Sequence, residues 1–301
     1  MDLGRGRHVR LRTVRADRLA LAAAPVVAGV VLAAVAGGGW WPGAGARTAA
    51  PAAASAVAAP STPSVPSAPP ARATTPAPWR VVGLGDSVTS GHGCDCDFVA
   101  DYARLTAKAT GRTVTSRNLG VDGWTSADLV DALAGDTAQA GAVREGDIVL
   151  VTIGANDFYR GLGTWQDSGC TGGDCFTADA ATVRGNVAKI VEEVRALRAG
   201  APTQVLVTDY WNVFEDGSRA VRDHGRSYLD VARTATAAAN AAIVAGARAG
   251  GATPVDLLGP FERADGGVDA LLQDDGDHPD DDGHALIART LAEQGWTAFR
   301  T

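Results

Sequence analysis

The stretch that decides the fold is residues 79–88, WRVVGLGDSV, in which an apolar run ends in a glycine turn and a serine. Arg80 to Leu84 is mostly apolar and β-branched, as is typical of a short strand buried on both faces. Gly85 permits the tight backbone that would present the Ser87 side chain above the edge of a sheet. A serine in such a turn often caps the following helix, so a nucleophile here needs partners elsewhere in the chain.

The rest of the globular part alternates short strands with helices. Further apolar, β-branched runs predict strands at 113–116, 147–153, 204–208 and 253–257. Ala-rich stretches predict helices at 98–110, 126–133, 178–198, 227–249 and 283–299. Strands that alternate with helices of this length form parallel βαβ units. We therefore predict an α/β fold of three layers (α/β/α), with helices on both faces of one mostly parallel five-stranded sheet.

The start of the chain has the pattern of an export signal. Six arginines precede residue 19, and residues 19–41 carry no charge. The apolar run is close to the roughly 20 residues that span a bilayer, so residues 1–46 are predicted to be either a cleaved signal peptide or a retained signal anchor. In both cases the remainder lies outside, and we expect a protein that is secreted or anchored on the outer face of the cytoplasmic membrane.

Residues 47–78 are rich in Ala, Pro, Ser and Thr, a composition that buries too little apolar area to offset the loss of chain entropy. They are predicted to form a disordered linker. Residues 79–301 are sufficient for one sizeable core and are predicted to be a single domain.

The globular part is acidic. The chain has 27 basic and 34 acidic residues, of which residues 1–78 hold 8 and 2, so the remainder has 19 and 32 and a net charge of −13. Without a cluster of Lys or Arg, such a domain is a poor candidate for binding nucleic acid or an anionic membrane surface. We expect a monomer with no nucleic-acid partner.

Four cysteines, Cys94, Cys96, Cys170 and Cys175, make an even number in a chain with an export signal, which favours disulfides. A bridge from Cys94 to Cys96 is expected to be strained, whereas Cys170 to Cys175 closes a small glycine-rich loop easily. The cross pairing, which would tie the loop after the serine to the later loop, stays open, and so does a four-cysteine zinc site.

A histidine near the end of the chain supplies the first partner for Ser87. Asp275 precedes His278 by three residues, so in a turn its carboxylate can accept the Nδ1 proton and leave Nε2 as a base. Asp277 is close enough to compete for this role. The same acidic run would also suit a hydrated surface turn.

Two further segments follow predicted strands and offer hydrogen-bond donors to a developing oxyanion. Asn118-Leu119-Gly120 offers the N–H of Gly120, and Gly154-Ala155-Asn156-Asp157 offers the amide of Asn156. Such residues are also ordinary in turns. Because the carboxyl ends of parallel strands converge on one edge of a sheet, we expect all these segments to face one another.

In order and approximate spacing, these segments resemble the four sequence blocks of the SGNH/GDSL hydrolase family, in particular its secreted bacterial members. The residues that carry the resemblance are Gly85-Asp86-Ser87-Val88, Gly120, Asn156, Asp275 and His278-Pro279. It extends over residues 79–301, with one conservative departure, Val88, where Leu or Ile is commoner.

The resemblance implies a flavodoxin-like fold and a carboxylic-ester hydrolase without a cofactor or metal. It implies Ser87 as nucleophile, His278 as general base and acid, and Asp275 as the carboxylate that orients it. It also implies an oxyanion hole made by the N–H groups of Ser87 and Gly120 and the side chain of Asn156. The substrate would be a small-molecule, lipid or carbohydrate ester.

We therefore predict an extracellular esterase or lipase that acts through an acyl-enzyme. The alternatives are a carbohydrate O-acetyl esterase or acetyl transferase of the same fold, and a catalytically silent surface-binding protein. Aromatic residues in 158–176 and 210–214, Trp211 among them, are candidates to line the substrate pocket or to belong to the core.

Overall fold

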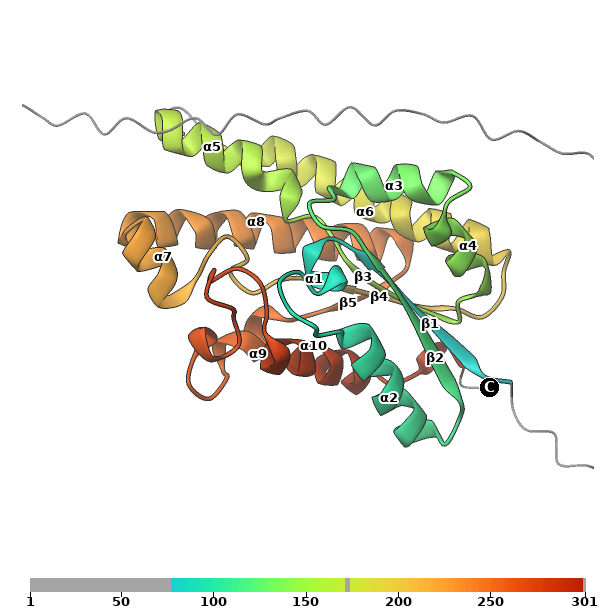
Figure 1. Ribbon diagram of the computed structural model, residues 1–301. Helices are drawn as coiled ribbons and strands as arrows, with labels where there is room; N and C mark the ends of the chain where they lie inside the picture. The colour runs from blue at the N-terminus through green and yellow to red at the C-terminus, as the bar shows by residue number, and fades with distance from the viewer. Residues whose placement is uncertain (1–76, 171–173, 300–301) are drawn as a thin grey trace, which may run out of the picture. The chain divides into compact units, whose positions relative to one another are not determined.

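The computed structural model describes residues 77–170 and 174–299 (Figure 1). The predicted leader, residues 1–46, and nearly all of the predicted linker, residues 47–78, lie outside these ranges. All described residues belong to one compact unit. Within the described ranges, no helix is both long enough and apolar enough to cross a membrane.

Five parallel strands form one sheet in the order β2-β1-β3-β4-β5, which confirms the predicted three-layer α/β/α fold. The strands are β1 (Trp79–Gly85), β2 (Val114–Gly120), β3 (Ile148–Thr152), β4 (Gln204–Thr208) and β5 (Thr253–Val255). β3 and β4 are buried at every position, as their continuous apolar sequences predict.

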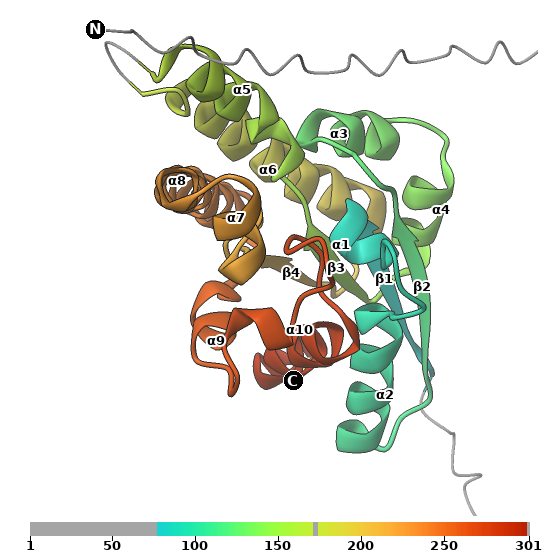
Figure 2. The ribbon, with the colours of Figure 1, turned by 60° about the vertical axis from the view of Figure 1, so that its left-hand side comes forward.

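Helices cover both faces of the sheet (Figures 1 and 2). One face carries α2 (Phe98–Thr110) and α10 (Asp281–Glu293), and the other carries α3 (Ser126–Ala134), α4 (Ala138–Glu145), α6 (Thr177–Arg198) and α8 (Arg226–Gly250). The remaining helices are α1 (Ser87–Ser90), η1 (Asn156–Phe158), α5 (Tyr159–Ser168), α7 (Gly217–Asp223), α9 (Leu258–Glu262), η2 (Val268–Ala270) and η3 (Thr297–Phe299).

The end of β1 lies at the topological switch point of the sheet, where successive crossovers lead to opposite sides of this strand. From β1 the first crossover leads to β2 on one side, and the next leads back past β1 to β3 on the other. The register sets Gly85 opposite both Gly120 and Thr152, so the carboxyl ends of three strands are level. A crevice forms at such a switch point in doubly wound sheets, and Ser87 lies directly after it.

β2 is longer than the predicted strand 113–116. Asn118 and Gly120, expected in the following loop, are its last residues and pair with β1. As an edge strand, β2 is only partly buried, and it therefore tolerates polar residues such as Arg117 that do not resemble a buried strand.

The last predicted helix, 283–299, is two elements. α10 ends at Glu293, and the chain turns at Gly295, whose φ of 65° is a left-handed conformation that favours glycine, before the short η3. η3 brings Phe299 against Trp79, with ring centroids 4.5 Å apart, so the two ends of the domain are packed together.

Candidate active site

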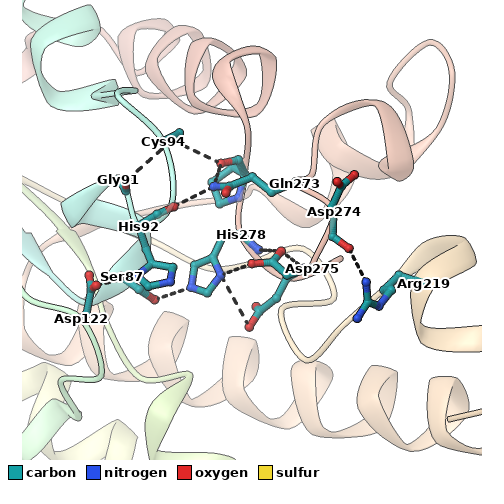
Figure 3. Close-up of polar contacts among 12 residues, drawn as sticks. Ser87, Gly91, His92, Cys94, Asp122, Arg219, Gln273, Asp274, Asp275 and His278 are labelled. Atoms are coloured by element: carbon teal, nitrogen blue, oxygen red, sulfur yellow. Dashed lines mark hydrogen bonds and ion pairs between the residues drawn. The ribbon is translucent and has the colours of Figure 1, made fainter. Parts of the chain in front are cut away.

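Ser87, His278 and Asp275 lie in one line of hydrogen bonds (Figure 3). His278 Nε2 is 2.9 Å from Ser87 Oγ, and His278 Nδ1 is 2.8 Å from Asp275 Oδ2. Ser87 begins α1 after the first strand, whereas the other two belong to the loop before the last helix. The fold thus joins groups 191 residues apart into a nucleophile, a base and an orienting carboxylate.

The turn that presents Ser87 depends on Gly85 and Asp86. Gly85 has φ 147°, and a side chain there would collide with the carbonyl oxygen of Thr152. Asp86 caps α1 by accepting a hydrogen bond from Val88 N, and its carboxylate also accepts one from the hydroxyl of Tyr210 after β4. Burial raises the pKa of Asp86 to about 6. The sequence motif contains Asp86, but its contact with Tyr210 could not be predicted.

Asp275 organises the turn that carries His278. Its Oδ1 accepts hydrogen bonds from the backbone N–H groups of Asp277, at 2.9 Å, and His278, at 3.0 Å, while Oδ2 faces the ring. Partial burial acts to raise the pKa of Asp275, but these bonds and the His278 ring outweigh it, and the pKa lies below its ordinary value. The carboxylate that faces Nδ1 is therefore ionised at neutral pH.

Asp277, the rival for this role, lies farther from the ring. Its Oδ2 is 4.0 Å from His278 Nδ1, and its side chain is 18% exposed. Burial first, and then the negative charge of Asp275, raise the pKa of Asp277 to about 8. One carboxyl group beside His278 is thus charged and the other neutral at pH 7.

Side chains from distant elements hold this loop. Gln273 Nε2 donates to the carbonyl oxygens of His92, at 2.7 Å, and Pro279, at 2.9 Å, and Arg219 donates to that of Asp274 (Figure 3). The Trp211 indole donates to the carbonyl oxygen of Asp277, at 3.1 Å.

Trp211 is 1% exposed and stacks on Phe261, with ring centroids 4.4 Å apart. Trp211 therefore belongs to the core and does not line a substrate pocket. From there it supports the loop that carries His278. Phe158 and Phe176 are buried as well, whereas Tyr159 is 51% exposed.

The two predicted oxyanion donors differ in their present partners. Asn156 begins η1 after β3, and its Nδ2 donates to Trp124 O at 2.8 Å, which leaves one amide hydrogen for another acceptor. The N–H of Gly120 donates to Asn118 Oδ1 at 3.1 Å, so this donor is already engaged. A side chain at Gly120 would collide with the backbone of Thr89 and Ser90, which explains the glycine.

The four cysteines lie in two local pairs, Cys94 with Cys96 and Cys170 with Cys175. The Cα atoms of the two pairs are 5.2 and 5.4 Å apart, within the range that a disulfide spans. Neither the cross pairing nor a four-cysteine cluster is formed. Cys94 and Cys96 adjoin His284, which is buried and accepts the N–H of Phe98.

Several solved structures are similar to this chain. The lipase Lip_vut3 from a goat rumen metagenome is 17% identical with a TM-score of 0.60, over 72% of this chain and 98% of that one. A lipase/acylhydrolase from Enterococcus faecalis is 21% identical with a TM-score of 0.50, over 72% and 94%. A catalytic mutant of an acetylxylan esterase from Geobacillus stearothermophilus is 18% identical with a TM-score of 0.49, over 74% and 97%.

Among curated proteins, no sequence matches the chain. The family model described as "GDSL-like Lipase/Acylhydrolase family" matches residues 84–286, a span that begins just before Ser87 and includes Asp275 and His278. The chain therefore belongs to the GDSL-like lipase/acylhydrolase family and is a carboxylic-ester hydrolase of the SGNH/GDSL type.

Proposed function

We propose that the protein is an extracellular esterase or lipase that forms an acyl-enzyme at Ser87, with His278 as general base and acid and Asp275 as the residue that orients its ring. The observation that carries this proposal is the unbroken line from Ser87 Oγ through both ring nitrogens of His278 to Asp275. An ionised carboxylate on Nδ1 fixes the tautomer in which Nε2 accepts the serine proton.

In the first half-reaction, Ser87 Oγ attacks the ester carbonyl carbon while His278 Nε2 takes the hydroxyl proton. The bond to the alcohol then breaks, and the imidazolium returns this proton to the alcohol oxygen. In the second, His278 takes a proton from water as the water oxygen attacks the acyl carbon. The carboxylic acid leaves and Ser87 Oγ regains the proton.

The oxyanion would be bound by the N–H of Ser87 and by the remaining amide hydrogen of Asn156. As the first residue of α1, Ser87 has an N–H with no partner inside the helix. Gly120 N–H would become a third donor once the substrate oxygen displaces Asn118 Oδ1.

We also propose that the protein is exported. The start of the chain, rich in arginine and then apolar, supports this proposal, with residues 1–46 as signal peptide or anchor and residues 47–78 as a linker. Disulfides between Cys94 and Cys96 and between Cys170 and Cys175 would fit an oxidising compartment. The intact mass before and after reduction and alkylation of the exported protein tests both bridges.

The test of the activity is a series of p-nitrophenyl esters from acetate to palmitate, with Ser87→Ala and His278→Ala alongside. We expect hydrolysis that both variants abolish, and the preferred chain length separates an esterase from a lipase. A folded wild-type protein that hydrolyses none of these esters would favour a specialised carbohydrate substrate or the silent surface-binding alternative.

A second candidate function is removal or transfer of acetyl groups on carbohydrate. One observation favours it: the half-exposed side chain of His92 lies beside the ring of His278 and is paired with the half-exposed carboxylate of Asp122. Polar side chains beside the leaving group suit an alcohol with further hydroxyl groups better than they suit an apolar alcohol. Release of acetate from acetylated polysaccharide, compared with hydrolysis of long-chain esters, separates the two candidates.

A further inference from the structure

A second histidine–carboxylate pair lies beside the proposed triad. His92 Nδ1 is 2.5 Å from Asp122 Oδ2 (Figure 3). The hydroxyl of Ser90 donates to Asp122 Oδ1. The Ser90 bond is the main cause that holds the pKa of Asp122 below its ordinary value, with smaller contributions from His92 and His278. Asp122 is thus ionised at neutral pH and positioned to fix the His92 ring.

The backbone of His92 is fixed as firmly as its ring. Its N–H donates to Ser87 O at 3.1 Å, and its carbonyl oxygen accepts the Gln273 amide at 2.7 Å. The ring lies alongside that of His278, with centroids 4.6 Å apart (Figure 3). His92 is therefore held from α1, from the loop after β2 and from the loop that carries His278, unlike a free surface histidine.

The leaving alcohol has to come close to this ring. His278 Nε2 takes its proton from Ser87 Oγ and has to deliver it to the alcohol oxygen, which requires hydrogen-bond distance. The alcohol half of the ester therefore lies next to the His278 ring, and His92 flanks that ring. The side chains of His92 and Asp122 are 49% and 51% exposed, so a substrate can reach them.

The chemistry that His92 offers is specific. In the tautomer that donates Nδ1–H to Asp122, Nε2 has a lone pair that accepts a hydrogen bond from a hydroxyl group. An alcohol without a second hydroxyl would leave this acceptor to water and gain nothing.

We propose that His92, oriented by Asp122, is a specificity-determining residue that binds a free hydroxyl on the alcohol half of the substrate, so that the preferred substrates are esters of polyols. This inference rests on the proposed function. The shared chemistry is a hydroxyl next to the esterified oxygen, and a sugar or a glycerol moiety could supply it.

The experiment compares kcat/KM of the full-length protein for three acetates: a monoacetylated sugar, glycerol monoacetate and ethyl acetate, with p-nitrophenyl acetate as a reference. We expect the wild type to favour one of the polyol esters over ethyl acetate by about tenfold, the size of effect that a single hydrogen bond gives. The better of the two polyol esters identifies the source of the hydroxyl.

His92→Phe keeps a flat ring against His278 and removes the nitrogen. We expect it to lower the ratio of polyol-ester to p-nitrophenyl-acetate kcat/KM by about tenfold. Asp122→Asn should lower the same ratio. The matched control is His224→Phe, which removes a histidine that is also partly exposed and paired with a carboxylate, Glu215, and should leave the ratio unchanged.

Two results would overturn the inference: a wild type with no preference for the polyol esters, or a His92→Phe protein that loses the same factor on all esters. An equal loss on all esters would mean that His92 only packs against the His278 ring and does not bind a substrate hydroxyl. Activity on p-nitrophenyl acetate that depends on Ser87 would uphold the proposed function in either case, and its absence would remove both proposals.

Discussion

Asp275 and Asp277 show how position decides the role of a residue. They are the same residue type, two positions apart and both near His278, yet one accepts the ring proton at 2.8 Å and the other lies 4.0 Å away. Two backbone N–H groups and the imidazole keep Asp275 charged, whereas burial keeps Asp277 neutral. The spacing to His278 favours Asp275 in the sequence, but it leaves Asp277 as a competitor.

The pair provides a matched test at the residue scale. Asp275→Asn should lower kcat for p-nitrophenyl acetate by on the order of 10² to 10⁴, because an amide on Nδ1 disturbs the tautomer of His278. Asp277→Asn replaces a neutral carboxyl by a neutral amide of the same shape and should cost less than about tenfold. Steady-state kinetics at pH 7 compares the two, and a larger loss in Asp277→Asn would reverse the assignment.

Asn156→Ala tests the oxyanion hole. Removing one hole donor typically lowers kcat by about 10² to 10³. We expect a loss of this size with little change in KM, since the donor acts on charge that develops in the transition state. Thermal unfolding serves as the control for the lost bond to Trp124. Unchanged turnover would remove Asn156 from the hole.

At the scale of elements, α5 is a helix that the sequence pattern does not predict. Its sequence, YRGLGTWQDS, contains two glycines that disfavour a helix, and no helix was predicted there. Gly161 lies where a side chain would come within 2.7 Å of the Cys175 carbonyl oxygen and 2.8 Å of Asp179, whereas Gly163 has open space around it. Tertiary packing thus requires one glycine and merely tolerates the other.

This difference predicts opposite effects on stability. Gly161→Ala should lower the free energy of unfolding by about 1–3 kcal/mol, because the backbone of Cys175 has to move. Gly163→Ala should raise it by about 0.5–1 kcal/mol through helix propensity. Urea unfolding followed by circular dichroism measures both, and a stabilising Gly161→Ala would contradict the packing described for α5.

The strands and helices that were predicted well are those in which local pattern and burial agree. β4 at Gln204–Thr208 and α2 at Phe98–Thr110 have the predicted bounds. The end of β2 at Gly120 is level with Gly85 because the two strands pair in register, and the loop before α10 brings His278 to Ser87. The sequence could not reveal contacts made across the fold, such as Tyr210 with Asp86 or His92 with Asp122, since these depend on loop conformation.

At the scale of the whole molecule, three carboxyl groups link stability to pH: Asp86 and Asp209 are buried, and Asp277 is largely buried. Burial raises the pKa values of Asp86 and Asp209 to about 6 and that of Asp277 to about 8. In the unfolded chain an Asp titrates near 3.9. The folded state therefore binds more protons than the unfolded state between these values, and its stability falls as the pH rises through them.

We accordingly expect the contribution of these groups to the free energy of unfolding to be largest below about pH 4 and to decrease from there toward pH 8, by on the order of several kcal/mol. Asp277→Asn removes the group with the highest pKa and should flatten the curve between about pH 6 and 8. Urea denaturation at several pH values measures the slope. An equally steep curve in the variant would show that Asp277 ionises freely in the folded protein.

The distance along the chain between the nucleophile and its base has a consequence for biogenesis. Ser87 follows the first strand and His278 precedes α10, so a growing chain holds the serine long before it holds the imidazole. Until the final loop docks against α1, the proposed mechanism has no base, and the nascent chain is unable to attack esters. Hydrolytic activity would then report that the whole domain has been synthesised and folded.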